Sequence, residues 1–213
     1  MIRSSIPVTR PLFAVRLAAL LAAFLLAGCG ERVPRVAAVG PDEAIVAFGD
    51  SLTYGTGAAE SESYPAVLAQ LIGRKVVRSG VPGEVTAQGL ARLPRVIEEH
   101  RPALIIVCLG GNDMLRRVDD QQIRGNLRQI ITTVRGRGIS VVLVGVPRPA
   151  LLTSAAVFYG ELAKEYGIPY EGKVLNDIMH QLDLKADTIH PNAKGYRRMA
   201  EAIAELLKKA GAI

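Results

Sequence analysis

Residues 44–57 read AIVAFGDSLTYGTG, an apolar run that stops at Gly49-Asp50-Ser51 and gives way to small polar residues. The apolar half is typical of a strand buried on both faces. The turn after it has two interpretations. Asp50 or Ser51 caps a following helix, or the turn presents Ser51 as a nucleophile. Taken alone, the stretch favours the structural interpretation, so the rest of the chain has to decide.

The segments after this strand alternate between apolar strands and amphipathic helices. Pro94 is expected to break one of the helices or to begin a new turn. Strands that are apolar throughout and separated by helices predict a parallel sheet covered on both faces. The sequence therefore predicts one α/β domain over residues 44–213, a three-layer α/β/α sandwich with a central parallel sheet of about five strands. The strands are expected at 44–48, 75–77, 103–109, 139–146 and 168–170, and the helices at 64–72, 86–100, 121–134, 154–166 and 192–209.

Residues 1–28 have a different character from the rest of the chain. Three arginines are their only charges, and an apolar run follows from Leu17 to Ala27. The run is shorter than the ~20 residues needed to span a bilayer, and it fits the core of a secretory signal peptide. Its end, Leu26-Ala27-Gly28-Cys29, resembles a bacterial lipoprotein signal, which implies that Cys29 is acylated and becomes the new N-terminus. A plain signal peptide with a chance cysteine is the alternative.

Residues 29–43 are predicted to be the lipidated cysteine and a flexible tether with a reach of roughly 20 Å. Gly30 does not resemble the aspartate of inner-membrane retention. We therefore expect a lipid-anchored protein of the cell envelope, in the outer membrane and facing the periplasm. If Cys29 carries lipid, Cys108 has no disulfide partner, and its apolar surroundings indicate a core residue.

The composition bears on partners and cofactors. The chain has a net charge of +6, no Trp and 5% aromatic residues. Its Lys and Arg residues are scattered, and part of the excess lies in residues 1–28. A solvated surface is therefore favoured over a nucleic-acid interface. Nothing in the sequence resembles a metal-ligand cluster, so neither a metal nor an organic cofactor is expected.

A serine nucleophile needs a base, and two of the three histidines follow an aspartate by three residues. His180 follows Asp177 on a predicted helix face, whereas His190 follows Asp187 in a turn. Spacing does not choose between the pairs, but the turn can aim both side chains at the active edge of the sheet. Asp187 would then hold His190, which would take the proton of Ser51. A local cap before the last helix is the alternative role for this pair.

An oxyanion needs hydrogen-bond donors, and three candidates follow predicted strands. Gly83 has no Cβ, which lets a backbone N–H approach a substrate closely. Asn112 offers a side-chain amide that does not titrate, and the N–H of Ser51 is a third donor. A simple turn glycine and a helix cap are the alternatives for the first two. Because the carboxyl ends of parallel strands carry active sites, the three are expected to lie together.

Four segments together resemble the blocks of the SGNH (GDSL) hydrolase superfamily, in order. They are Gly49-Asp50-Ser51-Leu52, Gly83, Gly110-Gly111-Asn112-Asp113 and Asp187-Thr188-Ile189-His190. The chain is similar to the bacterial thioesterase I, lysophospholipase L1 and arylesterase branch from about Ile45 to Leu207. The resemblance implies a flavodoxin-like sandwich. It also implies that Ser51 is the nucleophile, His190 the base and Asp187 its orienting partner, with Gly83, Asn112 and the Ser51 amide as oxyanion hole.

The second block departs from the pattern of that branch. It usually starts with an asparagine and has Asp-Thr after the glycine, where this chain has Arg78 and Glu84-Val85. Because Gly83 itself is present, the oxyanion donor is not in doubt. The departure instead concerns the packing and the charge beside that donor.

The expected function is that of a serine esterase acting on acyl esters or thioesters, lysophospholipids included, through an acyl-enzyme on Ser51. An O-acetyl esterase acting on cell-envelope glycan is one alternative, and a non-catalytic envelope-binding lipoprotein is another. The segment after the fourth strand follows a strand end and carries Leu151 and Leu152. The resemblance places this region near the substrate, so both leucines are expected to form one wall of an acyl groove.

Overall fold

The computed structural model describes residues 32–148 and 154–213 of the 213-residue chain. The signal segment with Cys29 lies outside the described residues, and so do Leu151 and Leu152. In the part of the chain that is described, no helix is long and apolar enough to cross a membrane.

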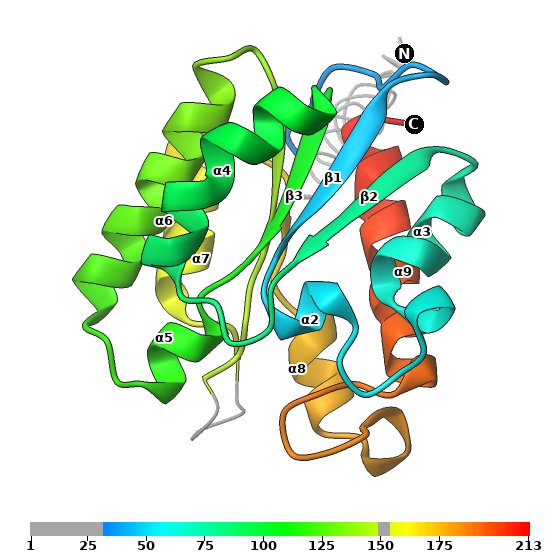
Figure 1. Ribbon diagram of the computed structural model, residues 1–213, viewed down its shortest axis with the longest axis vertical. Helices are drawn as coiled ribbons and strands as arrows, with labels where there is room; N and C mark the ends of the chain where they lie inside the picture. Colours follow the sequence, from blue (N-terminus) through cyan, green and yellow to red (C-terminus); the bar gives the residue numbers. More distant parts are fainter. Residues whose placement is uncertain (1–31, 149–153) are drawn as a thin grey trace, which may run out of the picture. The chain divides into compact units, whose positions relative to one another are not determined.

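A five-stranded parallel sheet forms the centre of the domain (Figure 1). Its spatial order is β2-β1-β3-β4-β5, so β1 and β3 are the one pair of neighbouring strands in this sheet that do not follow each other in the chain. The three central strands are buried almost throughout, which explains why their sequences are apolar without alternation. The predicted parallel sheet is confirmed. Its strands are β1 (Ala44–Gly49), β2 (Lys75–Gly80), β3 (Leu104–Cys108), β4 (Ser140–Val144) and β5 (Tyr170–Glu171).

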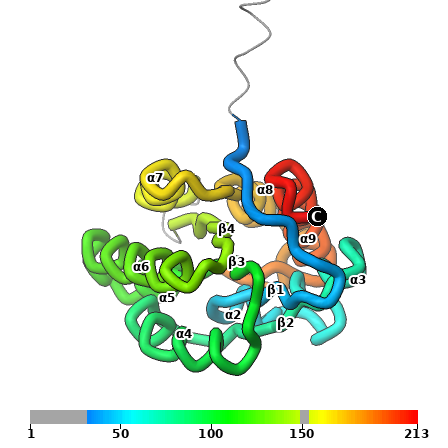
Figure 2. The backbone as a smooth tube through the Cα atoms, turned by 90° about the horizontal axis from the view of Figure 1, so that it is seen from above, coloured from blue at the N-terminus to red at the C-terminus, as the bar shows by residue number. Residues whose placement is uncertain are grey.

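Helices cover both faces of this sheet, as the view in Figure 2 shows. One layer holds α4 (Thr86–His100), α6 (Asp120–Arg135) and α7 (Val157–Tyr166), and the other holds α3 (Tyr64–Ile72), α8 (Val174–Met179) and α9 (Ala193–Ala210). The longest of them, α9, buries an apolar face that includes Met199, Ile203 and Leu207. The three-layer α/β/α sandwich is therefore confirmed.

Two short helices and two 3₁₀ turns complete the part of the domain that the structure describes. They are α2 (Ser51–Tyr54), α5 (Gly111–Leu115) and the 3₁₀ turns Glu60–Glu62 and Leu182–Leu184. The short helices have too few residues to show an apolar period, and the sequence analysis did not predict them. Both directly follow a strand, which places them at one edge of the sheet.

Pro94 does not break its helix, contrary to expectation. α4 runs without interruption from Thr86 to His100 with Pro94 inside it. A proline in a helix interior costs about 3 kcal/mol. The same helix buries Leu93, Val96 and Ile97, and burial of each such side chain contributes about 1.5–3 kcal/mol. Tertiary packing thus outweighs the lost hydrogen bond.

The N-terminal segment of the described chain packs on the domain and is not a tether. The N–H of Val36 donates to the carbonyl of Ala210 (3.1 Å), and that of Val39 donates to Ala212 (2.8 Å). The Val39 side chain is only 4% exposed. These bonds satisfy carbonyl groups at the end of α9, which have no partner within the helix. The prediction of a flexible tether over residues 29–43 is therefore wrong from Val33 onward, where the compact unit begins.

Candidate active site

The register of the sheet aligns the carboxyl ends of β1, β2 and β3. Gly49 at the end of β1 pairs with Gly80 of β2 on one side and with Cys108 of β3 on the other. The segments that follow these strands therefore start side by side. They are α2, the loop from Val81 to Val85 and α5, which lie at the lower edge of the sheet in Figure 1.

The turn after β1 satisfies both interpretations of the sequence. Asp50 is the N-cap of α2, and its carboxylate accepts the N–H of Leu52 at 3.0 Å. Ser51 is the first residue of the helix and lines a cavity at the edge of the sheet. Gly49 is required because a Cβ there would collide with the carbonyl oxygen of Cys108. The cap thus holds the turn that presents Ser51.

Three side chains from distant parts of the sequence form a chain of hydrogen bonds. His190 Nε2 lies 3.0 Å from Ser51 Oγ, and His190 Nδ1 lies 2.8 Å from Asp187 Oδ2. The second carboxylate oxygen, Asp187 Oδ1, accepts the N–H groups of Ile189 and His190, both at 2.8 Å. An aspartate that accepts from Nδ1 favours the tautomer in which Nε2 is free to accept the serine proton.

Asp187 is held in its ionised form. Desolvation opposes ionisation, but the hydrogen bonds from Ile189 N–H and from the side chain and N–H of His190 outweigh it, so the pKa of Asp187 is lowered. The aspartate side chain is 51% exposed and the histidine 14%. The pair therefore carries a fixed negative charge behind the imidazole, which would stabilise the imidazolium that forms when serine loses its proton.

The second Asp-x-x-His pair is not brought to this site. His180 ends α8 and is exposed, and its Nδ1 is 2.8 Å from the carbonyl of Asn176 rather than bonded to Asp177. Only His190 of the two histidines lines the cavity beside Ser51.

Gly83 and Asn112 line the same cavity as Ser51 and His190. Gly83 has φ +78°, a conformation that favours glycine, and a Cβ there would meet only the Arg116 guanidinium at 3.9 Å. The space beside its Cα is therefore open, while its carbonyl accepts from Arg116 Nη2 at 2.9 Å.

The Asn112 amide is already held in place. Its Nδ2 donates to Asp50 Oδ2 (3.2 Å) and to the carbonyl of Glu84 (3.0 Å). Because an amide nitrogen carries two hydrogens, a negatively charged oxygen beside Ser51 would have to share one of them. The donor is thus oriented before any substrate arrives.

Asp50 is a site residue that sequence reasoning treated only as a cap. It is 1% exposed, and burial, together with the charges of Glu84 and Asp113, raises its pKa to about 7. A polar residue at the end of a fully apolar strand was the signal available in the sequence. Its contact with Asn112, 62 positions away, was not.

An apolar cavity of about 230 Å³ opens beside Ser51. Leu175 and Met179 of α8 form one wall, one helical turn apart, and Val146 and Pro147 after β4 form another. Leu52, Pro82, Leu115 and Ile189 complete the apolar lining. The sequence analysis did not identify the α8 residues. They lie in a six-residue helix that precedes the fourth block and belongs to none of the four, and nothing in the sequence marks them as facing the serine.

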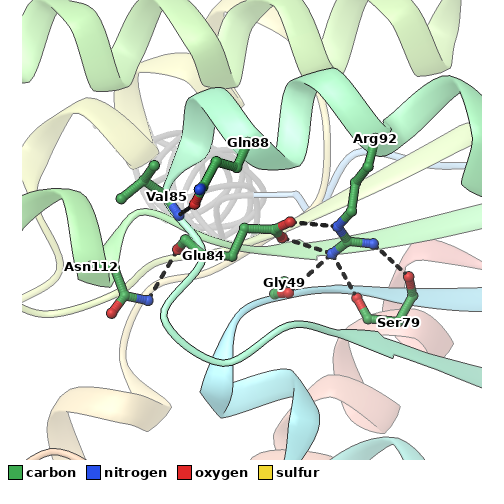
Figure 3. A network of polar contacts seen from close by, with 7 residues as sticks. All are labelled: Gly49, Ser79, Glu84, Val85, Gln88, Arg92 and Asn112. Atoms are coloured by element: carbon green, nitrogen blue, oxygen red, sulfur yellow. Dashed lines mark hydrogen bonds and ion pairs between the residues drawn. The ribbon is translucent and has the colours of Figure 1, made fainter.

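Arg78 and Glu84, which depart from the family pattern around Gly83, lie in different places relative to the cavity. Arg78 lies away from the cavity, where it donates to the carbonyl of Tyr54 (2.6 Å) and pairs with Glu60 (2.9 Å). Glu84 is 4% exposed and is paired with Arg92 of α4, as Figure 3 shows. The charge introduced beside Gly83 is therefore internally compensated.

Sequence comparison identifies relatives over most of the chain. The profile of the GDSL-like Lipase/Acylhydrolase family matches residues 47–198. The thioesterase 1/protease 1/lysophospholipase L1 of Escherichia coli K12 is 33% identical over 178 residues, which cover 78% of this chain and 84% of that protein. Esterase TesA of Pseudomonas aeruginosa is 29% identical over 199 residues, covering 87% and 98%.

Solved structures agree with this grouping. AlinE4, an SGNH-hydrolase family esterase, is 34% identical, with a TM-score of 0.63 over 81% of this chain and 98% of that one. The crystal structure of TesA is 28% identical, with a TM-score of 0.67 over 79% and 99%. The chain belongs to the GDSL-like lipase/acylhydrolase family, and it is a serine hydrolase of carboxylic esters.

Proposed function

We propose that Ser51 attacks the acyl carbonyl of an ester or thioester while His190 Nε2 takes its proton. Asp187 holds the imidazole and stabilises the imidazolium. The N–H groups of Ser51 and Gly83 and the amide of Asn112 stabilise the oxyanion. His190 then protonates the leaving alcohol or thiol. Water, activated by the same histidine, releases the acid from the acyl-serine.

The unbroken chain of hydrogen bonds from Asp187 through His190 to Ser51 carries this proposal. It ends at a cavity that also exposes both further oxyanion donors. Nucleophile, base and orienting group at these distances are the arrangement that serine acyl transfer requires.

The cavity supports an acyl chain of short to medium length as the preferred group. Its volume of about 230 Å³ lies below the ~300–1,000 Å³ of pockets for drug-sized ligands. Leu175, Met179 and Val146 offer apolar surface and no hydrogen-bond partner for a sugar. This favours acyl esters and thioesters of short to medium chain length over the alternative of an O-acetylated envelope glycan.

Hydrolysis of p-nitrophenyl esters over a series of acyl lengths, followed by thioesters and lysophospholipids, tests both parts of the proposal. Ser51→Ala should lower kcat by about 10⁴-fold or more in a protein that remains folded. His180→Ala is the matched control and should leave kcat unchanged, because its ring lies outside the cavity. A folded Ser51→Ala variant with a tenth of the wild-type activity would contradict the assignment of the nucleophile.

We also propose that lipid on Cys29 anchors the enzyme in the cell envelope, in the outer membrane and facing the periplasm. The support is the order of apolar run, small residues and cysteine in the sequence. Two acyl chains suffice for stable anchoring, whereas one chain is marginal. Cys29→Ser should move the protein from the membrane to the soluble fraction with its esterase activity intact. Unchanged sedimentation with membranes would refute the anchor.

A further inference from the structure

A partly buried ion pair joins Glu84, the residue after Gly83, to Arg92 of α4 (Figure 3). Glu84 Oε1 accepts from Arg92 Nε at 2.6 Å, and Glu84 Oε2 accepts from Arg92 Nη2 at 2.7 Å. Two parallel bonds of this kind fix direction as well as distance. The glutamate side chain is 4% exposed and the arginine side chain 23%. Rotation of the carboxylate away from the guanidinium would leave a buried charge without a partner.

The same guanidinium also binds the ends of two strands. Arg92 Nη1 donates to Ser79 Oγ at 2.8 Å, and Nη2 donates to the carbonyls of Ser79 (3.0 Å) and Gly49 (3.2 Å). It lies over the Phe48 ring, 4.1 Å from the centroid. Gly49 ends the strand that leads into Ser51, and Ser79 lies at the end of β2. One side chain of α4 thus joins both strand ends to Glu84.

The backbone of Glu84 is hydrogen-bonded to one of the oxyanion donors and to its own loop. Its carbonyl accepts from Asn112 Nδ2 at 3.0 Å, and its N–H donates to the carbonyl of Val81 at 3.1 Å. Gly83 directly precedes it. Any shift of residue 84 would therefore move the Gly83 N–H and the Asn112 amide together. Neither Glu84 nor Arg92 lines the cavity.

Building on the proposed function, we propose that Glu84 and Arg92 are positioning residues that fix the oxyanion donors relative to Ser51. Oxyanion stabilisation depends on donors placed before the reaction, and a displacement of about 1 Å can cost about 10²-fold in rate. The ion pair fixes the position of the Gly83 N–H relative to Ser51, because it connects the Gly83 loop to the strand that leads into Ser51.

The test uses two conservative variants. Glu84→Gln keeps the size of the side chain but loses its negative charge, and Arg92→Lys keeps the positive charge but loses the planar fork that makes the bidentate contact. Each should lower kcat by about 10- to 100-fold with KM within about twofold, since the donors act in the transition state. Inhibition by an alkyl trifluoromethyl ketone, which forms a tetrahedral oxyanion on the serine, should weaken by the same factor. A role in folding alone would lower the fraction of active enzyme, and so the apparent kcat, but it would leave the inhibitor affinity of the folded molecules unchanged.

The chain offers a matched control in a second bidentate pair. Arg128 of α6 donates to Glu165 of α7 through Nε (3.1 Å) and Nη2 (2.9 Å), away from the cavity. Arg128→Lys and Glu165→Gln remove the same chemistry and should leave kcat and inhibitor affinity unchanged.

A double variant separates positioning from stability. Glu84→Met combined with Arg92→Met replaces the ion pair by apolar side chains of similar volume, a change that is often neutral or stabilising. Its melting temperature should stay near that of the wild type, while kcat stays low because the links to Gly49 and Ser79 are lost. A double variant with wild-type stability and wild-type kcat would overturn the proposal. This result can be read even if one of the single variants fails to fold.

The two proposals fail in different ways. Activity retained in folded Ser51→Ala contradicts the proposed function itself. If Ser51→Ala is inactive but folded Glu84→Gln and Arg92→Lys keep kcat within twofold, only the positioning role is refuted. Losses confined to KM, or unchanged inhibitor affinity, refute it equally.

Discussion

Asp50→Asn should flatten the dependence of stability on pH. In the folded enzyme, burial raises the pKa of Asp50 from its ordinary 3.8 to about 7, with the Glu84 and Asp113 charges adding to the effect. The unfolded chain releases this proton near its ordinary pKa, whereas the folded protein retains it. Raising the pH through the interval between the two values therefore favours the unfolded chain.

The size of the effect follows from the two pKa values. A difference of about 3 in pKa corresponds to about 4 kcal/mol of unfolding free energy, lost as the pH rises from about 4 to above 7. About 3 kcal/mol of this falls between about pH 5 and about pH 8. Asparagine at position 50 can still accept the N–H of Leu52 but does not titrate. Its amide facing that of Asn112 costs stability equally at all pH values, so it does not change the slope.

Urea unfolding of both proteins at about pH 5 and about pH 8 measures the difference. With a slope of about 1–3 kcal/mol per molar urea, the midpoint of the wild type should fall by about 1–3 M more than that of Asp50→Asn. Asp183→Asn, which removes an exposed carboxylate, controls for the change in net charge. Parallel pH profiles of the wild type and Asp50→Asn would mean that Asp50 is ionised throughout, and would refute the reasoning.

Three further changes test the site and the fold. Asn112→Ala should lower kcat about 10²- to 10³-fold, the usual effect of one lost oxyanion donor, and an effect on KM alone would assign Asn112 to substrate binding. Met179→Trp should shorten the longest acyl chain accepted in the p-nitrophenyl ester series, because the larger side chain fills part of the cavity and each excluded CH₂ loses about 0.8 kcal/mol of binding. Equal losses of activity on acetate and on longer esters would instead indicate damage to the triad. Val39→Ala should lower the unfolding free energy by about 1–2 kcal/mol in urea titrations without changing kcat, because Val39 is buried at the end of α9; an unchanged midpoint would show that this segment does not stabilise the fold.

Elements with a strong pattern were predictable from the sequence, and the exceptions have local causes. The helix over Tyr64–Ile72 and that over Thr86–His100 have the expected bounds, because their apolar faces repeat over two or more turns. The Gly- and Pro-containing segment before β1 was misjudged. Its polar composition hid the contribution of Val36 and Val39, which depends on carbonyl groups at the far end of the chain.

The candidate site was predictable at the positions that belong to a sequence motif. Ser51, Asp187 and His190 carry their chemistry in residue type and local context, and the structure joins them by hydrogen bonds. The acyl-binding wall has no such marker. Leu175 and Met179 look like ordinary core residues in the sequence, and only the packing of α8 turns them toward Ser51. Leu151 and Leu152, which lie outside the described residues, remain a prediction for this wall.

The electrostatics of the site depend on three buried carboxyl groups close to a place where negative charge develops. Glu84 is matched by the guanidinium of Arg92, and Asp113 accepts the N–H (2.8 Å) and the hydroxyl (2.6 Å) of Thr86. Among the described residues Asp50 has no cation as a hydrogen-bond partner, and its raised pKa favours the neutral form. Without these compensations, an oxyanion beside Ser51 would face up to three unscreened negative charges in a region of low dielectric.

Replacing Arg92 by a neutral residue would therefore have two effects. It would release the Gly83 loop and leave the Glu84 charge to oppose the oxyanion. Because only the second effect disappears when Glu84 is also made neutral, the kcat of the double Met variant relative to Arg92→Met alone separates geometry from charge.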